Sequence, residues 1–117
     1  KIDMEGIIST IAGTGEKGYR GDGEDAKYAL LNGPKAIRCD NDGNILVVDT
    51  ENHALRIIYT ESNIIDTFAG GTLGSGGDGG PPTMAGLARP HGVVTDLSGI
   101  TYIADSENHR IRTIRYQ

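Results

Sequence analysis

An internal repeat that covers nearly all of the 117 residues constrains this chain more than any other feature of its sequence. The shift between matched positions is 57 residues from Ile8 to Ile65, and 56 residues from Gly21 to Gly77 onward. The identical pairs include Asp22/Asp78, Pro34/Pro90, Asp40/Asp96, Gly43/Gly99, Asp49/Asp105, Glu51/Glu107, Asn52/Asn108, His53/His109, Arg56/Arg112 and Ile58/Ile114. A fixed period of this length indicates a fold built from one repeated supersecondary unit.

Each copy contains short apolar segments that are separated by residues typical of tight turns. The segments are 36–40, 45–48, 55–59 and 64–69 in the first copy, and 92–96, 100–104 and 111–116 in the second. Asp42-Gly43 marks a hairpin, because an Asp-Gly pair tolerates positive φ. The segments are rich in β-branched and aliphatic residues, which favour strands. A full copy therefore predicts four short antiparallel strands, named A to D here.

Two segments, 44–53 and 103–112, contain the sequence Asp-x-Glu-Asn-His and resemble the signature of the NHL-repeat family, named for its Asn-His-Leu core. The Gly-Asp-Gly, Ala, Leu and Pro-x-Gly-Val pattern at 77–93 resembles the long-loop variant of this repeat. The first copy departs from it at Ala36, where Gly is usual. The resemblance implies an all-β fold of four-stranded antiparallel β-propeller blades. The family commonly has six of them, within the roughly four to eight found in propellers.

The repeats do not fall into two complete blades. Residues 7–12 match strand D, the first blade covers 34–69, and the second keeps strands A to C at 90–116. In the order D-ABCD-ABC, strand D of one copy could complete the ABC strands of the next. Two blades would also leave edge strands and apolar faces open. We therefore expect a six-bladed propeller, formed either by homo-oligomerisation, with a trimer favoured, or by the rest of a longer chain.

The polar residues that occur in both copies are interpreted as scaffold residues. They are Asp22, Asp49, Asn52 and His53, with Asp78, Asp105, Asn108 and His109 as their counterparts. An Asp-His pair can form a general base with an orienting carboxylate, and a carboxylate between glycines can bind calcium. We expect instead that the histidines bond turn backbone and tie adjacent blades together. We expect Asp22 and Asp78 to accept hydrogen bonds from loop N–H groups.

Residues at the start of strand A are the candidates for ligand binding, because they are not the same in the two copies. Lys35 aligns with His91, and Arg89 lies two residues before His91. His91 follows Pro90 at the mouth of the innermost strand. In the peptidylglycine amide-forming lyases, which resemble these propellers, a Pro-His pair at this position carries zinc ligands. A three-fold ring would bring three His91 side chains toward the axis, and imidazole suits zinc or copper.

The leading interpretation is a propeller scaffold or binding module that presents loops around a central channel to a protein, peptide or small molecule. A metal-dependent lyase or hydrolase with a His91 site is the alternative. No cofactor is expected for the leading interpretation, and zinc or calcium is the alternative. The net charge of −5 disfavours nucleic-acid partners. No apolar run approaches the length of a membrane-spanning helix, so no membrane partner is expected. Cys39 lies in an apolar strand pattern and is expected to be a buried thiol.

Overall fold

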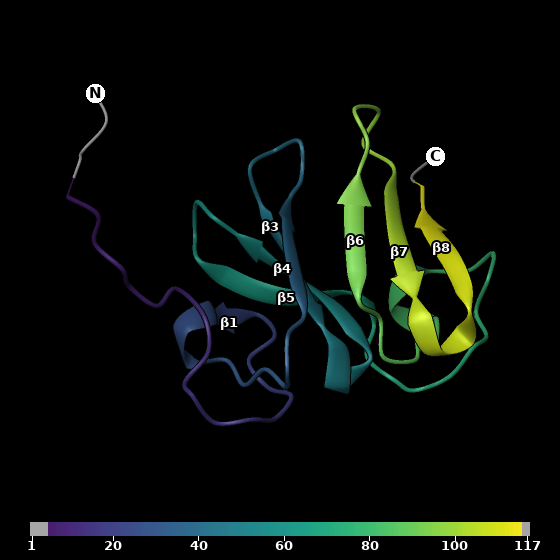
Figure 1. Ribbon diagram of the computed structural model, residues 1–117, viewed down its shortest axis with the longest axis horizontal. Helices are drawn as coiled ribbons and strands as arrows, with labels where there is room; N and C mark the ends of the chain where they lie inside the picture. The colour runs from purple at the N-terminus through teal and green to yellow at the C-terminus, as the bar shows by residue number, and fades with distance from the viewer. Residues whose placement is uncertain (1–4, 116–117) are drawn as a thin grey trace.

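The computed structural model describes residues 5–115, whose strands form two antiparallel sheets that lie side by side (Figure 1). The first sheet has the order β1-β5-β4-β3-β2, with bounds Glu24–Asp25, Ile64–Gly70, Ala54–Tyr59, Ile45–Asp49 and Ala36–Cys39 respectively. The second has the order β6-β7-β8, with bounds Gly92–Thr95, Thr101–Asp105 and Arg110–Ile114. Four 3₁₀-helices lie between successive strands of this part of the chain: η1 (Ala26–Tyr28), η2 (Thr50–Asn52), η3 (Pro82–Met84) and η4 (Ser106–Asn108). None of the helices in this part of the chain is long and apolar enough to span a membrane.

The predicted all-β fold is confirmed, and its strands correspond to the repeat. Strands β2 to β5 are strands A to D of blade one, and β6 to β8 are strands A to C of blade two. The hairpin turn between β2 and β3 forms because Asp40 Oδ1 accepts hydrogen bonds from the N–H groups of Asp42 and Asn44, both at 2.9 Å. Gly43 adopts φ +83° in this turn, a conformation that glycine tolerates without strain. Asp96 forms the same turn in blade two.

Three local features differ from the sequence-based expectations. Residues 7–12 form no strand within this single chain, and none of them pairs in a sheet ladder. Their pairing with another chain therefore stays a prediction. The two-residue strand β1, which pairs with β5, lies in the long segment before strand A, where no strand was expected. Cys39 is exposed rather than buried, because it lies at the end of β2, an edge strand. Tyr116 lies outside the described residues.

The main core lies between the two blades. From blade one it takes Leu46, Val48, Leu55, Ile57 and Ala69, and from blade two Val93, Ile103 and Ile114. Two polar contacts accompany it: the buried hydroxyl of Thr50 donates to the Pro90 carbonyl at 2.8 Å, and the exposed Asn41 Nδ2 donates to the Asp96 carbonyl at 3.0 Å. One face of blade one is therefore sealed by the opposite face of blade two.

A second apolar cluster lies on the other face of blade one, under the loop at 13–33. It consists of Ala26, Ala29, Val47, Ile58 and Ile65. Its residues come from η1 and the loop as well as from strands, and Ile65 on β5 is completely buried among them. The long loop thus serves as part of the core of its own blade.

Candidate functional site

Arg56, on β4, is a charged residue that is fully buried. Its NH1 donates to Asp49 Oδ2 at 2.9 Å and to the Leu30 carbonyl at 3.2 Å. Its NH2 donates to Asp22 Oδ1 at 3.0 Å and to the Arg20 carbonyl at 3.1 Å. Arg56 therefore connects strand C to two separate parts of the long loop, at residues 20–22 and at Leu30.

Asp49, at the end of β3, is the buried counter-ion of Arg56. Besides the guanidinium, its carboxylate accepts hydrogen bonds from the Asn32 N–H at 2.7 Å and from Asn52 Nδ2 at 2.9 Å. Asn52 Nδ2 also donates to the Gly18 carbonyl at 2.7 Å. Burial of a charged pair is tolerated when the remaining lone pairs and protons are satisfied in this way. The Asp-x-x-Asn part of the signature therefore holds the long loop against strands B and C through hydrogen bonds.

Blade two repeats this network around Arg112. Its NH1 donates to Asp105 Oδ2 at 2.9 Å and to the Gly86 carbonyl at 2.8 Å. Asn108 Nδ2 donates to Asp105 Oδ2 at 2.8 Å and to the Gly74 carbonyl at 2.7 Å. The two networks differ at Nε, which donates to Asp78 in Arg112 but is buried without a hydrogen bond in Arg56.

The expectation that Asp22 and Asp78 accept hydrogen bonds from loop N–H groups is wrong. Both carboxylates point at the strand-C guanidinium instead, with Asp22 at 3.0 Å from Arg56 NH2 and Asp78 at 2.9 Å from Arg112 NH2. An arginine offers several charged donors in one plane, which compete well against single amides for a carboxylate. Each of the two loop carboxylates is therefore the ion-pair partner of a strand-C guanidinium.

The histidines of the signature lie in the turn between strands B and C, each with a left-handed backbone: φ is +54° at His53 and +55° at His109. His53 Nδ1 accepts a hydrogen bond from the Arg89 N–H at 3.0 Å. This bond joins the turn of blade one to the segment that leads into β6. His109, the counterpart in blade two, is exposed. Within one chain the contact therefore forms once, at the boundary between the two blades.

Arg89 bridges the turns of the two blades. Its Nε and NH2 donate to the Glu51 carboxylate at 3.1 and 2.8 Å, and its NH1 lies 3.8 Å from Glu107 Oε2. The hydrogen bonds from Arg89 lower the pKa of Glu51, and those same bonds raise the pKa of Arg89. Lys35 also acts electrostatically on Glu51. Two of the three candidate ligand-binding residues are thus held near one carboxylate.

His91 and Lys35 occupy equivalent places at the start of strand A. The His91 N–H donates to the Ala104 carbonyl, and the Lys35 N–H donates to the Val48 carbonyl, both at 3.1 Å. Both side chains are exposed. Over residues 5–115, no group of three or more His, Cys, Asp or Glu side chains is arranged to hold a metal ion. A zinc site at His91 would therefore need ligands from outside this part of the chain.

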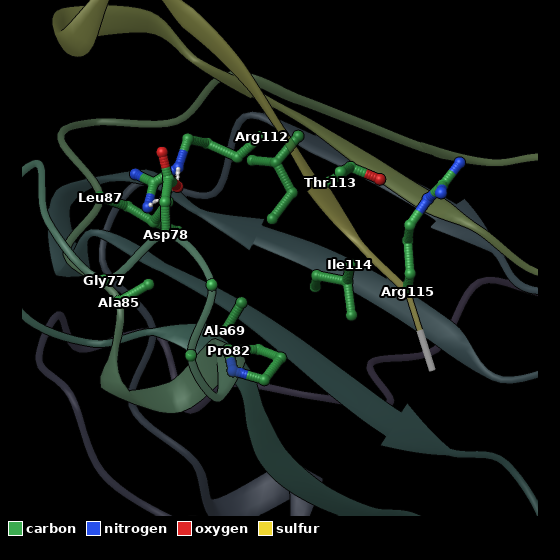
Figure 2. A pocket seen from close by; sticks show the side chains of 13 residues that line it. Ala69, Gly77, Asp78, Pro82, Ala85, Leu87, Arg112, Thr113, Ile114 and Arg115 are labelled. Carbon is green, nitrogen blue, oxygen red and sulfur yellow. Dashed lines mark hydrogen bonds and ion pairs between the residues drawn. The ribbon is translucent and has the colours of Figure 1, made fainter. Parts of the chain in front are cut away.

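A cavity of about 240 Å³ opens beside the free edge of β8 (Figure 2). Its apolar wall includes Leu87, Ile103 and Ile114, and its polar rim includes Asp78 and Arg112. Figure 2 shows Asp78 and Arg112 joined to each other at one end, while Ile114 extends toward the open space. This cavity lies away from the start of strand A, where the sequence placed the ligand site.

The two buried arginines are the main site residues that the sequence interpretation did not single out. Arg56 and Arg112 align in the repeat, three residues after the histidines. The usable signal was that a charged residue recurs in an otherwise apolar strand C, together with recurring aspartates. A repeated charge inside a strand indicates a buried pair, because charged groups are seldom buried unless they are paired.

Comparison with known proteins agrees with this geometry. The family model described as NHL repeat matches residues 31–58 and 87–114. The protein SUPPRESSOR OF QUENCHING 1, chloroplastic, of Arabidopsis thaliana is 38% identical over 85 residues, which are 73% of this chain and 8% of that protein.

Solved structures of the same fold come from Bacteroides thetaiotaomicron. A protein of unknown function superposes with a TM-score of 0.76 at 25% identity, over 90% of this chain and 26% of that one. An auxiliary nutrient binding protein superposes with a TM-score of 0.71 at 29% identity, over 91% of this chain and 28% of that one. The chain thus spans about a quarter of the length of these structures.

Each matched segment covers strands A to C of one blade. Residues 31–58 cover β2, β3 and all but the last residue of β4, with the Asp49–Arg56 pair, and 87–114 contain β6 to β8, with the Asp105–Arg112 pair. The chain therefore carries two NHL repeats and belongs to the NHL-repeat family of β-propeller proteins.

Proposed function

We propose that this chain is a non-catalytic binding module of a propeller, and that it binds a ligand at the start of strand A through Lys35, Arg89 and His91. The observation that carries the proposal is a division of labour among the polar residues. Repeated residues form the buried ion pairs of the scaffold, as in Asp49–Arg56 and Asp105–Arg112. The exposed residues that differ between the copies gather where the A strands begin.

The chemistry of these three residues fits a ligand with an anionic group. Lys35 and His91 are exposed on equivalent positions of neighbouring strands, and the guanidinium of Arg89 is partly exposed between two glutamates. The Glu51 carboxylate fixes the guanidinium through hydrogen bonds to Nε and NH2. A peptide or small molecule with a carboxylate could accept hydrogen bonds from the remaining donors.

A similar structure is consistent with a role in binding. Part of the auxiliary nutrient binding protein of Bacteroides thetaiotaomicron has the same fold as this chain, over 91% of this chain's length. That description belongs to the other protein, and the fold hosts several functions. It is nevertheless consistent with a propeller whose loops carry small ligands.

An NMR titration tests the proposal. The ¹⁵N-labelled chain is titrated with succinate and with an acidic tetrapeptide, and amide shifts are followed at Lys35, Arg89 and His91. We expect saturable shifts that weaken in Lys35→Ala and His91→Ala. Lys17→Ala, which removes an exposed cation from the long loop, is the matched control and should leave the shifts unchanged. Shifts that are absent with both probes, or that respond equally to all three substitutions, would refute the site.

A further inference from the structure

Blade one shows how a D strand completes a blade. Strand β5 pairs with β4, and its Ile65 is completely buried in the cluster under the long loop. The Gly23 N–H donates to the Ile65 carbonyl at 2.7 Å, and the hydroxyl of Thr67 donates to Asp22 Oδ2 at 2.6 Å. One isoleucine and one threonine, two residues apart, therefore fasten strand D to the loop.

Among residues 5–115, blade two has the loop but no D strand beside β8, and a cavity occupies that place. The apolar wall of the cavity is formed by Leu87, Ile103 and Ile114. Their counterparts in the first copy, Leu31, Val47 and Ile58, surround Ile65 in blade one. The cavity beside β8 in Figure 2 is thus the position that the Ile65 side chain fills in blade one.

The polar rim of the cavity is more exposed to solvent than the equivalent residues of blade one. The Asp78 side chain is 71% exposed, whereas that of Asp22 in blade one is 39% exposed. Asp22 is covered by Thr67, which hydrogen-bonds it and also contacts the Tyr19 hydroxyl at 2.5 Å. Asp78 lacks such a threonine among the described residues. The edge of blade two therefore offers one apolar cavity and one exposed carboxylate, whose counterparts in blade one contact Ile65 and Thr67.

Residues 7–12 carry the matching side chains. In the repeat, Ile8 aligns with Ile65 and Thr10 aligns with Thr67. Ile8 is 98% exposed, which is a costly arrangement for a large apolar side chain in water. In Figure 1 this segment runs along the side of blade one that faces away from blade two. The segment is therefore far from the β8 edge of its own chain.

Two open faces of the chain are also complementary to each other. Val93 of blade two is 7% exposed because it packs on blade one, but its counterpart Ile37 is 63% exposed. Leu55 of blade one is fully buried against blade two, but its counterpart Ile111 is 70% exposed. The chain thus presents both halves of its own inter-blade interface, and such head-to-tail contacts close into rings when the rotation permits.

We infer that residues 7–12 of one copy add as strand D to β8 of a second copy of this chain. Transferring the β4–β5 register to β8 pairs Ile114 with Ile8, Thr113 with Ser9 and Arg112 with Thr10. In this register Ile8 fills the cavity and the Thr10 hydroxyl donates to Asp78. The inference concerns the interaction surface and does not depend on the ligand site.

Disulfide trapping tests the register. Ser9→Cys and Thr113→Cys are introduced together into a Cys39→Ser background, which removes the exposed native thiol. We expect mild oxidation to join different copies through these two positions, since disulfides require close Cα atoms. The pair Ser9→Cys with Ser98→Cys, which places the second thiol in the exposed turn between β6 and β7, is the control and should cross-link poorly. Equal cross-linking in both pairs would overturn the inferred register.

A second variant tests whether Ile8 fills the cavity, without the use of cysteine substitutions. Ile8→Lys should weaken self-association about tenfold or more, because it removes the apolar side chain from the cavity. Leu73→Lys is the matched control: Leu73 is exposed even with its neighbouring blade present, and the first copy has Lys17 at that position. Both variants are compared by sedimentation velocity over a concentration series. Self-association that Ile8→Lys leaves unchanged, or its absence in the parent chain, would overturn the inference.

Discussion

Removal of the Asp49 carboxylate should destabilise the fold strongly. Asp49 is fully buried and accepts hydrogen bonds from the Arg56 guanidinium, Asn52 Nδ2 and the Asn32 N–H. In Asp49→Ala the buried guanidinium keeps only the partly exposed Asp22 as a charged partner. Leaving one member of a buried pair behind costs about 3–5 kcal/mol. That is a large part of the roughly 5–15 kcal/mol by which domains are stable.

Urea unfolding followed by far-UV circular dichroism measures this loss, since the chain has no Trp to report by fluorescence. Asp78→Ala is the control, because its carboxylate is mostly exposed and such a pair contributes about 1 kcal/mol or less. The double variant Asp49→Leu with Arg56→Leu should recover part of the stability, because no unpaired charge is left buried. An Asp49→Ala variant that loses no more stability than Asp78→Ala would refute the stabilising role of the network.

Three further outcomes are expected. Gly77→Ala should lower the melting temperature more than Gly79→Ala. Both glycines have positive φ, so both substitutions strain the backbone. A Cβ added at Gly77 would lie 2.6 Å from Ala85 Cα, whereas a Cβ added at Gly79 would have no atom within 4 Å. The pKa of Glu51 is lowered from its ordinary 4.5 by its hydrogen bonds to Arg89. These bonds therefore stabilise the fold above pH 4.5, and the stabilisation is lost as the pH falls through the lower pKa of the folded state. The melting temperature of Glu51→Gln should differ from that of the parent chain at neutral pH and converge with it in acid. Metal analysis of the untagged chain after incubation with zinc should find none bound stoichiometrically, whereas zinc lost on His91→Ala would favour the lyase-like alternative.

The strands of the two blades could be predicted from the sequence because their patterns are local. The apolar segments at 45–48 and 64–69 became β3 and β5 with ends shifted by a residue, and the Asp-Gly turn formed as expected. The segment at 7–12 has the same local pattern as β5 but forms no ladder. A strand needs a neighbouring edge, and local pattern carries no information about where that edge is.

The candidate site was less predictable because its partners are distant in the sequence. The repeat identified Asp22 and Asp49 as recurring residues, but not that both bond Arg56, 34 and 7 residues away. The role of Arg89 as a bridge depends on the turn of the other blade, which brings Glu51 within hydrogen-bond distance. Pairings of this kind are set by how the loop folds over the sheet, and the loop has no periodic pattern to reveal it.

The central claim is that the open edge of blade two is completed by another copy of this chain. Multi-angle light scattering of the purified protein measures this directly through the mass in solution. A closed six-bladed ring predicts a mass of three 12.4 kDa chains, unchanged on moderate dilution. Another closed assembly would keep the strand exchange but contradict the six-bladed ring. A monodisperse species with the mass of one chain at all concentrations would contradict the claim itself.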